Sequence, residues 1–164
     1  MRSAIIAAGV VMPVIASIIS PPRLLVIWNT TGSTPIGLYT ITQALPKRGD
    51  LLLIRLPPDM EAVAVSRAIL LPNTPILKPV VAVAGDVVCR FGAAITINGR
   101  PAAIARELDQ HGRRLPVWRG CRHLSQLQVF VLARHPDSFD SRYFGPQDAH
   151  AAHGVAHPLM IVSN

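Results

Sequence analysis

Two side chains in this sequence are of the types needed for nucleophilic catalysis. Ser33 lies in a short segment rich in Thr, Gly and Pro, Thr31–Gly37, and Lys78 is the one charged residue between Leu71 and Ala84. A serine hydroxyl is a weak nucleophile at neutral pH unless a base removes its proton, and a lysine amine does so only when desolvation lowers its pKa. The alternative is that Ser33 belongs to a turn and Lys78 is an ordinary strand lysine whose amine reaches water.

The elements that must position these two residues are mostly strands. Fifteen prolines and eleven glycines are spread along 164 residues, which favours many short elements joined by turns over a helical bundle. Asn98-Gly99 is the strongest hairpin signal in the chain. Apolar runs predict strands at residues 24–28, 37–41, 51–56, 77–84, 87–90, 95–97 and 128–133.

The remaining segments complete a mainly β fold with one short helix. Asp59 is the predicted N-cap of that helix, which runs to about Leu70 before Pro72 stops it. Residues 135–146 read as a polar loop, and residues 149–164 can add an edge strand.

An apolar segment begins the chain, because residues 3–22 contain no charged side chain. At about 1.5 Å per residue, a helix of this length spans roughly 30 Å, the thickness of a bilayer's hydrocarbon core. A removable secretory signal begins in the same way, but no convincing pair of small residues marks a cleavage point here. We therefore expect a retained transmembrane anchor at 1–22, followed by one domain at 23–164 on the exported side of a membrane.

The formal charge of +7 raises the question of a nucleic-acid partner. The densest basic segment, residues 100–123, is interrupted by Glu107, Asp109, Pro116 and Gly120. No helix-turn-helix, finger or aromatic stacking motif accompanies it. The sequence therefore predicts no nucleic-acid binding, and a basic surface against anionic membrane lipid explains the charge at least as well.

The two cysteines, Cys89 and Cys121, fit either of two states. In an oxidising compartment they form one disulfide that closes a loop of about thirty residues, and otherwise they are two buried free thiols. The six histidines have no metal-ligand spacing with either cysteine. Neither a metal site nor a cofactor is expected.

Three segments, taken in order, resemble the type I signal peptidase family. Residues 31–39 (TGSTPIGLY) resemble its nucleophile box, residues 77–86 (LKPVVAVAGD) its lysine box, and residues 137–146 (DSFDSRYFGP) its last conserved box. A single residue between Ser33 and Pro35, followed by Gly-Leu-Tyr, is similar to the TraF-like branch of conjugative transfer systems. The resemblance implies the antiparallel β fold of signal peptidases behind an amino-terminal transmembrane helix.

The same resemblance assigns roles to the residues of the first two segments. Ser33 is expected to attack the scissile carbonyl and to form an acyl-enzyme, with Lys78 as general base. The backbone N–H of Ser33 and the hydroxyl of Thr31 match the oxyanion donors. Gly32 is expected to let the backbone approach the substrate closely.

The third segment is expected to support the site rather than to react. Ser138 matches the residue that holds the lysine amine, while Asp140 and Arg142 resemble a pair that fixes this loop. The alternative for that pair is an ordinary surface salt bridge. Asp86 is expected to be structural, in the turn after the lysine strand.

The resemblance implies an extended peptide substrate that adds to a sheet edge and places small side chains before the cut. Residues 36–39 and 80–83 are the expected edges. The candidate substrate-binding residues are Pro35, Ile36, Leu38, Tyr39, Val80 and Val81.

The implied substrate is an exported precursor such as a conjugative pilin, cut on the periplasmic side of the inner (cytoplasmic) membrane. Hydrolysis and cyclisation of the product both remain open. A non-catalytic anchored β domain that scaffolds a secretion complex is a second hypothesis. A cytosolic self-cleaving repressor is a third, disfavoured because no pair of DNA-binding helices precedes the domain.

Overall fold

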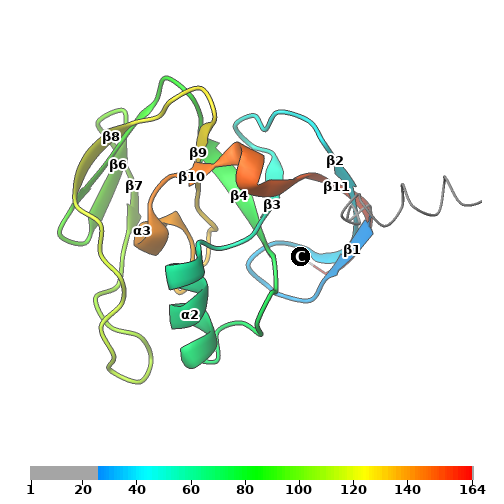
Figure 1. The fold of residues 1–164 in the computed structure, drawn as a ribbon, viewed down its shortest axis with the longest axis horizontal. Coiled ribbons are helices and arrows are strands. Elements are labelled where there is room, and N and C mark those ends of the chain that lie inside the picture. The colour runs from blue at the N-terminus through cyan, green and yellow to red at the C-terminus, as the bar shows by residue number, and fades with distance from the viewer. Residues whose placement is uncertain (1–25, 164) are drawn as a thin grey trace, which may run out of the picture.

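The computed structural model describes residues 26–163, and these form two antiparallel β-sheets (Figure 1). The predicted anchor at 1–22 lies outside the described residues. Within residues 26–163 no helix is both long and apolar enough to span a bilayer. The larger sheet has the order β1-β2-β11-β3-β4-β9-β10 and the smaller one β7-β6-β5-β8.

All strand pairs among the described residues are antiparallel, as the resemblance to signal peptidases implies. The strands of the larger sheet are β1 (Val26–Asn29), β2 (Ile36–Thr42), β3 (Leu51–Ile54), β4 (Ile76–Ala82), β9 (Gln128–Val131), β10 (Gln147–Asp148) and β11 (Ala152–Ser163). Those of the smaller sheet are β5 (Val87–Phe91), β6 (Ala94–Ile97), β7 (Arg100–Ile104) and β8 (Gly120–His123).

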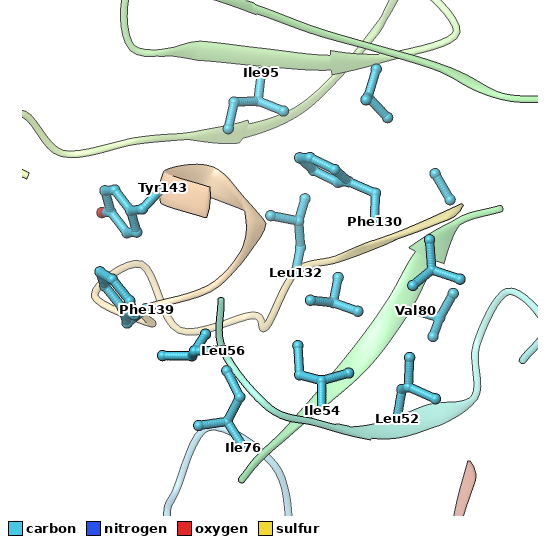
Figure 2. Close-up of a cluster of buried hydrophobic side chains, with 14 of the residues drawn as sticks. Leu52, Ile54, Leu56, Ile76, Val80, Ile95, Phe130, Leu132, Phe139 and Tyr143 are labelled. Atoms are coloured by element: carbon cyan, nitrogen blue, oxygen red, sulfur yellow. The ribbon is translucent and has the colours of Figure 1, made fainter. Parts of the chain in front are cut away.

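The main core lies between the two sheets. Figure 2 shows Leu52, Ile54 and Val80 of the larger sheet facing Ile95 of the smaller sheet, with Phe130 between them. A second cluster covers the opposite face of β3 and β4 and contains Tyr39, Ile41, Leu53, Leu77 and Ala156. Strand β3 is thus buried on both faces, which explains its uninterrupted Leu-Leu-Leu-Ile sequence.

The structure has more helix than the sequence predicts. Helix α2 (Pro58–Ser66) is the expected one, but its N-cap is Pro57 rather than Asp59, and Pro58 occupies the first turn. It ends before Leu70 because Ala68 adopts a positive φ of 56°. The supposed polar loop 135–146 also contains α3 (Ser141–Phe144), and a 3₁₀ turn, η1 (Ala149–Ala151), precedes β11.

Strand β11 corrects a second prediction. The carboxy-terminal segment is not an edge strand, because β11 pairs with β2 on one side and with β3 on the other. The Asn98-Gly99 hairpin is confirmed: it joins β6 to β7, and both residues have positive φ, 51° and 76°. A disulfide joins Cys89 on β5 to Cys121 on β8, so the alternative of two free thiols does not hold.

Candidate active site

Ser33 lies in the loop that connects β1 to β2, and a single buried side chain organises this loop. Asn29, the last residue of β1, is 7% exposed. Its Nδ2 donates to the backbone oxygens of Thr31, Thr34 and Pro35 at 3.0–3.2 Å and to the Thr34 hydroxyl at 3.0 Å. Its Oδ1 accepts from the N–H and the hydroxyl of Thr31 at 3.3 and 2.9 Å. The Asn29 side chain therefore holds the residues on both sides of Ser33.

Sequence analysis missed Asn29, although a signal was present. Asparagine at a strand end, followed by a segment rich in Thr, Gly and Pro, is typical of side chains that hydrogen-bond a neighbouring loop. Tyr39, a predicted substrate-binding residue, also supports this loop. It is fully buried, and its hydroxyl donates to the backbone oxygen of Pro35 at 2.6 Å.

Lys78 reaches the Ser33 loop from β4. Its side chain is on the same face of β4 as Ile76 and Val80, and the residue is 6% exposed. The Nζ atom donates to Ser33 Oγ at 3.0 Å and to Ser138 Oγ at 2.7 Å. The structure thus brings together one amine and two hydroxyl groups that are far apart in the sequence.

Burial changes the charge state of this lysine. Desolvation lowers the pKa of Lys78 to about 8, the nearby carboxylate of Asp140 opposes that shift, and the guanidinium of Arg142 adds to it. At pH 7 about a tenth of the molecules therefore carry a neutral amine at this position. A neutral amine can accept the proton of Ser33, which an ordinary surface lysine cannot do at this pH.

Asp140 and Arg142 form a buried ion pair behind Ser138 rather than a surface salt bridge. Asp140 is fully buried and caps α3 by accepting from the N–H of Arg142 at 3.1 Å. The pair also holds the chain just after β9, since Ala133 donates its N–H to Asp140 and its backbone oxygen accepts from Arg142 Nη2. Burial raises the pKa of Asp140, and the charge of Arg142 opposes this. These contacts fix the segment that carries Ser138.

The structure bears differently on the predicted roles of Thr31 and Gly32. The Thr31 hydroxyl oxygen lies 3.5 Å from Ser33 Oγ, but its proton is donated to Asn29 Oδ1. Thr31 must turn that proton away from Asn29 before it can stabilise an oxyanion. A Cβ at Gly32 would meet no atom within 4 Å, so packing of the described residues does not itself require glycine there.

The predicted substrate edges are wrong. Residues 36–39 lie in β2, between β1 and β11, and residues 80–82 of β4 pair with β9. No open edge exists at either place among the described strands. The six candidate residues, Pro35, Ile36, Leu38, Tyr39, Val80 and Val81, do not line the cavity at Ser33.

The cavity lies instead beside the segments that precede the two reactive residues. Its volume is about 680 Å³, and it opens onto Ser33 and Lys78. Strand β9 pairs with β4 only at Val80 and Ala82, so the half of β4 before Lys78 has an edge that no described strand covers. The cavity's lining residues include Ile27, Trp28, Leu53, Ile76, Leu77 and Phe139.

Asp86 has the structural role that the sequence suggests. Its carboxylate accepts hydrogen bonds from Arg48, from the N–H of Val83 and from Asn98. It thereby fixes the turn after β4, away from the cavity at Ser33.

A serine hydroxyl in contact with a buried lysine amine, beside an apolar cavity on an antiparallel β scaffold, is an arrangement in which a lysine can act as the base for a serine nucleophile. The chain belongs to the signal peptidase family, peptidase S26, whose pattern matches residues 1–160. Family membership implies a serine peptidase.

Two relatives place the chain in the TraF-like branch and confirm the resemblance seen in the sequence. A probable conjugal transfer protein TraF from Sinorhizobium fredii is 34% identical over 145 residues, covering 80% of this chain and 75% of the relative. A plasmid transfer protein TraF from Escherichia coli is 30% identical over 144 residues, covering 80% and 81%. A signal peptidase I from Enterococcus faecalis is similar in structure over 70% of this chain and 98% of its own, with a TM-score of 0.41 and 19% identity.

Proposed function

We propose that this protein is a membrane-anchored serine endopeptidase that cleaves an exported precursor for a conjugative transfer apparatus. The observation that carries the proposal is the contact between the buried, partly neutral amine of Lys78 and the hydroxyl of Ser33. Family membership and the conjugal transfer relatives support the reaction class and the biological setting.

The proposed reaction begins with the neutral amine of Lys78. It takes the proton of Ser33 as Oγ bonds to the scissile carbonyl carbon, and the carbonyl oxygen becomes an oxyanion held by the N–H of Ser33 and the hydroxyl of Thr31. The C–N bond then breaks, and the ammonium of Lys78 returns its proton to the leaving amine. Water attacks the resulting ester on Ser33 and releases the new carboxyl end, with Lys78 again as base.

The substrate would bind as an added strand. The open edge of β4 at Ile76–Lys78 offers backbone groups for an extended peptide whose scissile bond then lies at Ser33. A precursor such as a prepilin fits this mode, and an amino group in place of water at the last step would give a cyclic product.

The predicted location follows from the charge-free segment 3–22 and from the basic surface. We propose a single-pass anchor in the inner (cytoplasmic) membrane, with residues 23–164 on the periplasmic side and against anionic lipid. The site would then meet precursors where they leave the membrane.

Co-expression with a prepilin from the same transfer operon tests the proposal, with the mass of the product as readout. Ser33→Ala and Lys78→Ala are each expected to abolish processing, and Thr31→Ala to slow it by about 10²-fold. A linear and a cyclic product differ by the mass of one water. Normal processing by Ser33→Ala would favour the scaffold hypothesis instead.

A further inference from the structure

Besides Lys78, two basic residues line the cavity at Ser33, Arg55 and His153. Arg55 follows directly after β3, and His153 lies in β11 where the register with β3 shifts between Ala152 and Gly154. Burial lowers the pKa of His153, and the nearby charge of Arg55 lowers it further. None of the residues that line this cavity is an aspartate or a glutamate.

These two side chains lack partners among residues 26–163. All nine carboxylate side chains of the protein lie in that range, and Arg55 forms an ion pair with none of them. The Nε2 atom of His153 is buried and has no hydrogen-bond partner there. The buried ring nitrogen of His153 is the atom that indicates a missing polar partner, and the exposed guanidinium of Arg55 nearby favours an anionic one.

The strand register gives the distance of this place from the reactive residues. Leu52 of β3 pairs with Lys78, and Arg55 lies three residues further along. At about 3.3 Å per residue, the offset is roughly 10 Å, or about three residues of an extended peptide. Alternate side chains of such a peptide point to the face of the sheet that carries Leu53 and Leu77, on which Arg55 also lies by its spacing.

We propose that Arg55 and His153 form a subsite for an acidic side chain of the peptide substrate, about three residues from the scissile bond. This inference rests on the proposed peptidase function. The guanidinium binds the carboxylate as an ion pair, and the Nε2–H of a neutral His153 donates a hydrogen bond to it. Apolar side chains such as Leu53, Ile69 and Leu70 line the same cavity and would exclude some water from a bound carboxylate.

Cleavage of matched peptides tests the subsite. Each pair of peptides carries Glu or Gln at one position, and the position is moved from four residues before to four residues after the scissile bond. The wild-type protein is expected to cleave the Glu peptide about tenfold faster in kcat/KM at a position about three residues away. Arg55→Gln is expected to abolish the preference, and Arg55→Glu to replace it with a preference for Lys.

Arg100→Gln serves as the matched control, because Arg100 is exposed on the smaller sheet and does not line the cavity; it should keep the Glu preference. Equal cleavage of Glu and Gln peptides at every position overturns the subsite alone. Persistence of the preference in Arg55→Gln does the same. Absence of cleavage of all peptides by the wild-type protein overturns the proposed function, and the subsite with it.

Discussion

At the scale of single residues, the proposed reaction requires Lys78 to be uncharged before it can activate Ser33. The pKa of Lys78 is lowered to about 8, chiefly by burial, so the amine is mostly protonated at pH 7 and mostly neutral above pH 9. We therefore expect kcat/KM to rise about tenfold per pH unit below the midpoint and to level off above about pH 8. The pH profile of peptide cleavage measures this directly. Lys78→Arg should be inactive throughout, since a guanidinium stays protonated.

Asn29 is the residue whose effect on catalysis is least visible in the sequence. It lines the cavity but is only 7% exposed, and it forms no hydrogen bond with Ser33, yet it fixes both Thr31 and Pro35. Asn29→Ala should lower kcat by about tenfold to a hundredfold and leave KM within about twofold, because the loop loses its alignment rather than its binding surface. A parallel rise in KM with unchanged kcat would show that Asn29 acts on binding instead.

At the scale of elements, α3 and the segment before it form the support for Lys78. The carboxylate of Asp140 is fully buried against Arg142, so its removal leaves an unpaired buried cation. Asp140→Asn is expected to lower the free energy of unfolding by about 3 kcal/mol or more, measured by urea denaturation.

The same substitution also has a catalytic readout with a defined sign. The charge of Asp140 raises the pKa of Lys78, so Asp140→Asn should move the midpoint of the pH profile to lower pH. A midpoint that moves upward, or stays in place, would contradict the electrostatic role given to Asp140.

The sequence predicted some of these elements and missed others for physical reasons. Strong local signals were reliable: the Asn98-Gly99 turn and the apolar runs became a hairpin and strands where expected. Helix α3 has four residues, too few to show a helical period, so its segment looked like a loop. Strand β11 ends up inside the sheet through pairing with β2 and β3, which are far away in sequence and leave no local trace.

The reactive residues and the substrate edge show the same contrast. Ser33, Lys78 and Ser138 could be predicted because each lies in a recognisable segment, and the structure places them in contact. The proposed substrate edge could not be predicted, because it depends on where β9 stops pairing with β4. The sequence therefore predicts an edge after Lys78, at residues 80–83, whereas the residues of this strand that line the cavity come before Lys78.

At the scale of the whole molecule, the cavity and the disulfide belong to different sheets. Every residue that lines the cavity at Ser33 lies outside strands β5 to β8, whereas the disulfide joins β5 to β8. The bond closes a loop of 32 residues, so replacing both Cys89 and Cys121 by Ala should lower the free energy of unfolding by about 3 to 4 kcal/mol. Peptide cleavage at 25 °C should stay within about twofold of the wild type. A selective loss of activity in a folded variant would show that the smaller sheet takes part in the site.

The central claim is that Lys78 activates Ser33 as a nucleophile, and trapping the acyl-enzyme tests it most directly. The protein is mixed with a peptide ester substrate near pH 8, quenched in acid, and digested for mass spectrometry. The account predicts an acyl group on the fragment that contains Ser33 in the wild-type protein and none in Lys78→Met. An acyl group on another residue, or equal acylation of Ser33 in Lys78→Met, would contradict it.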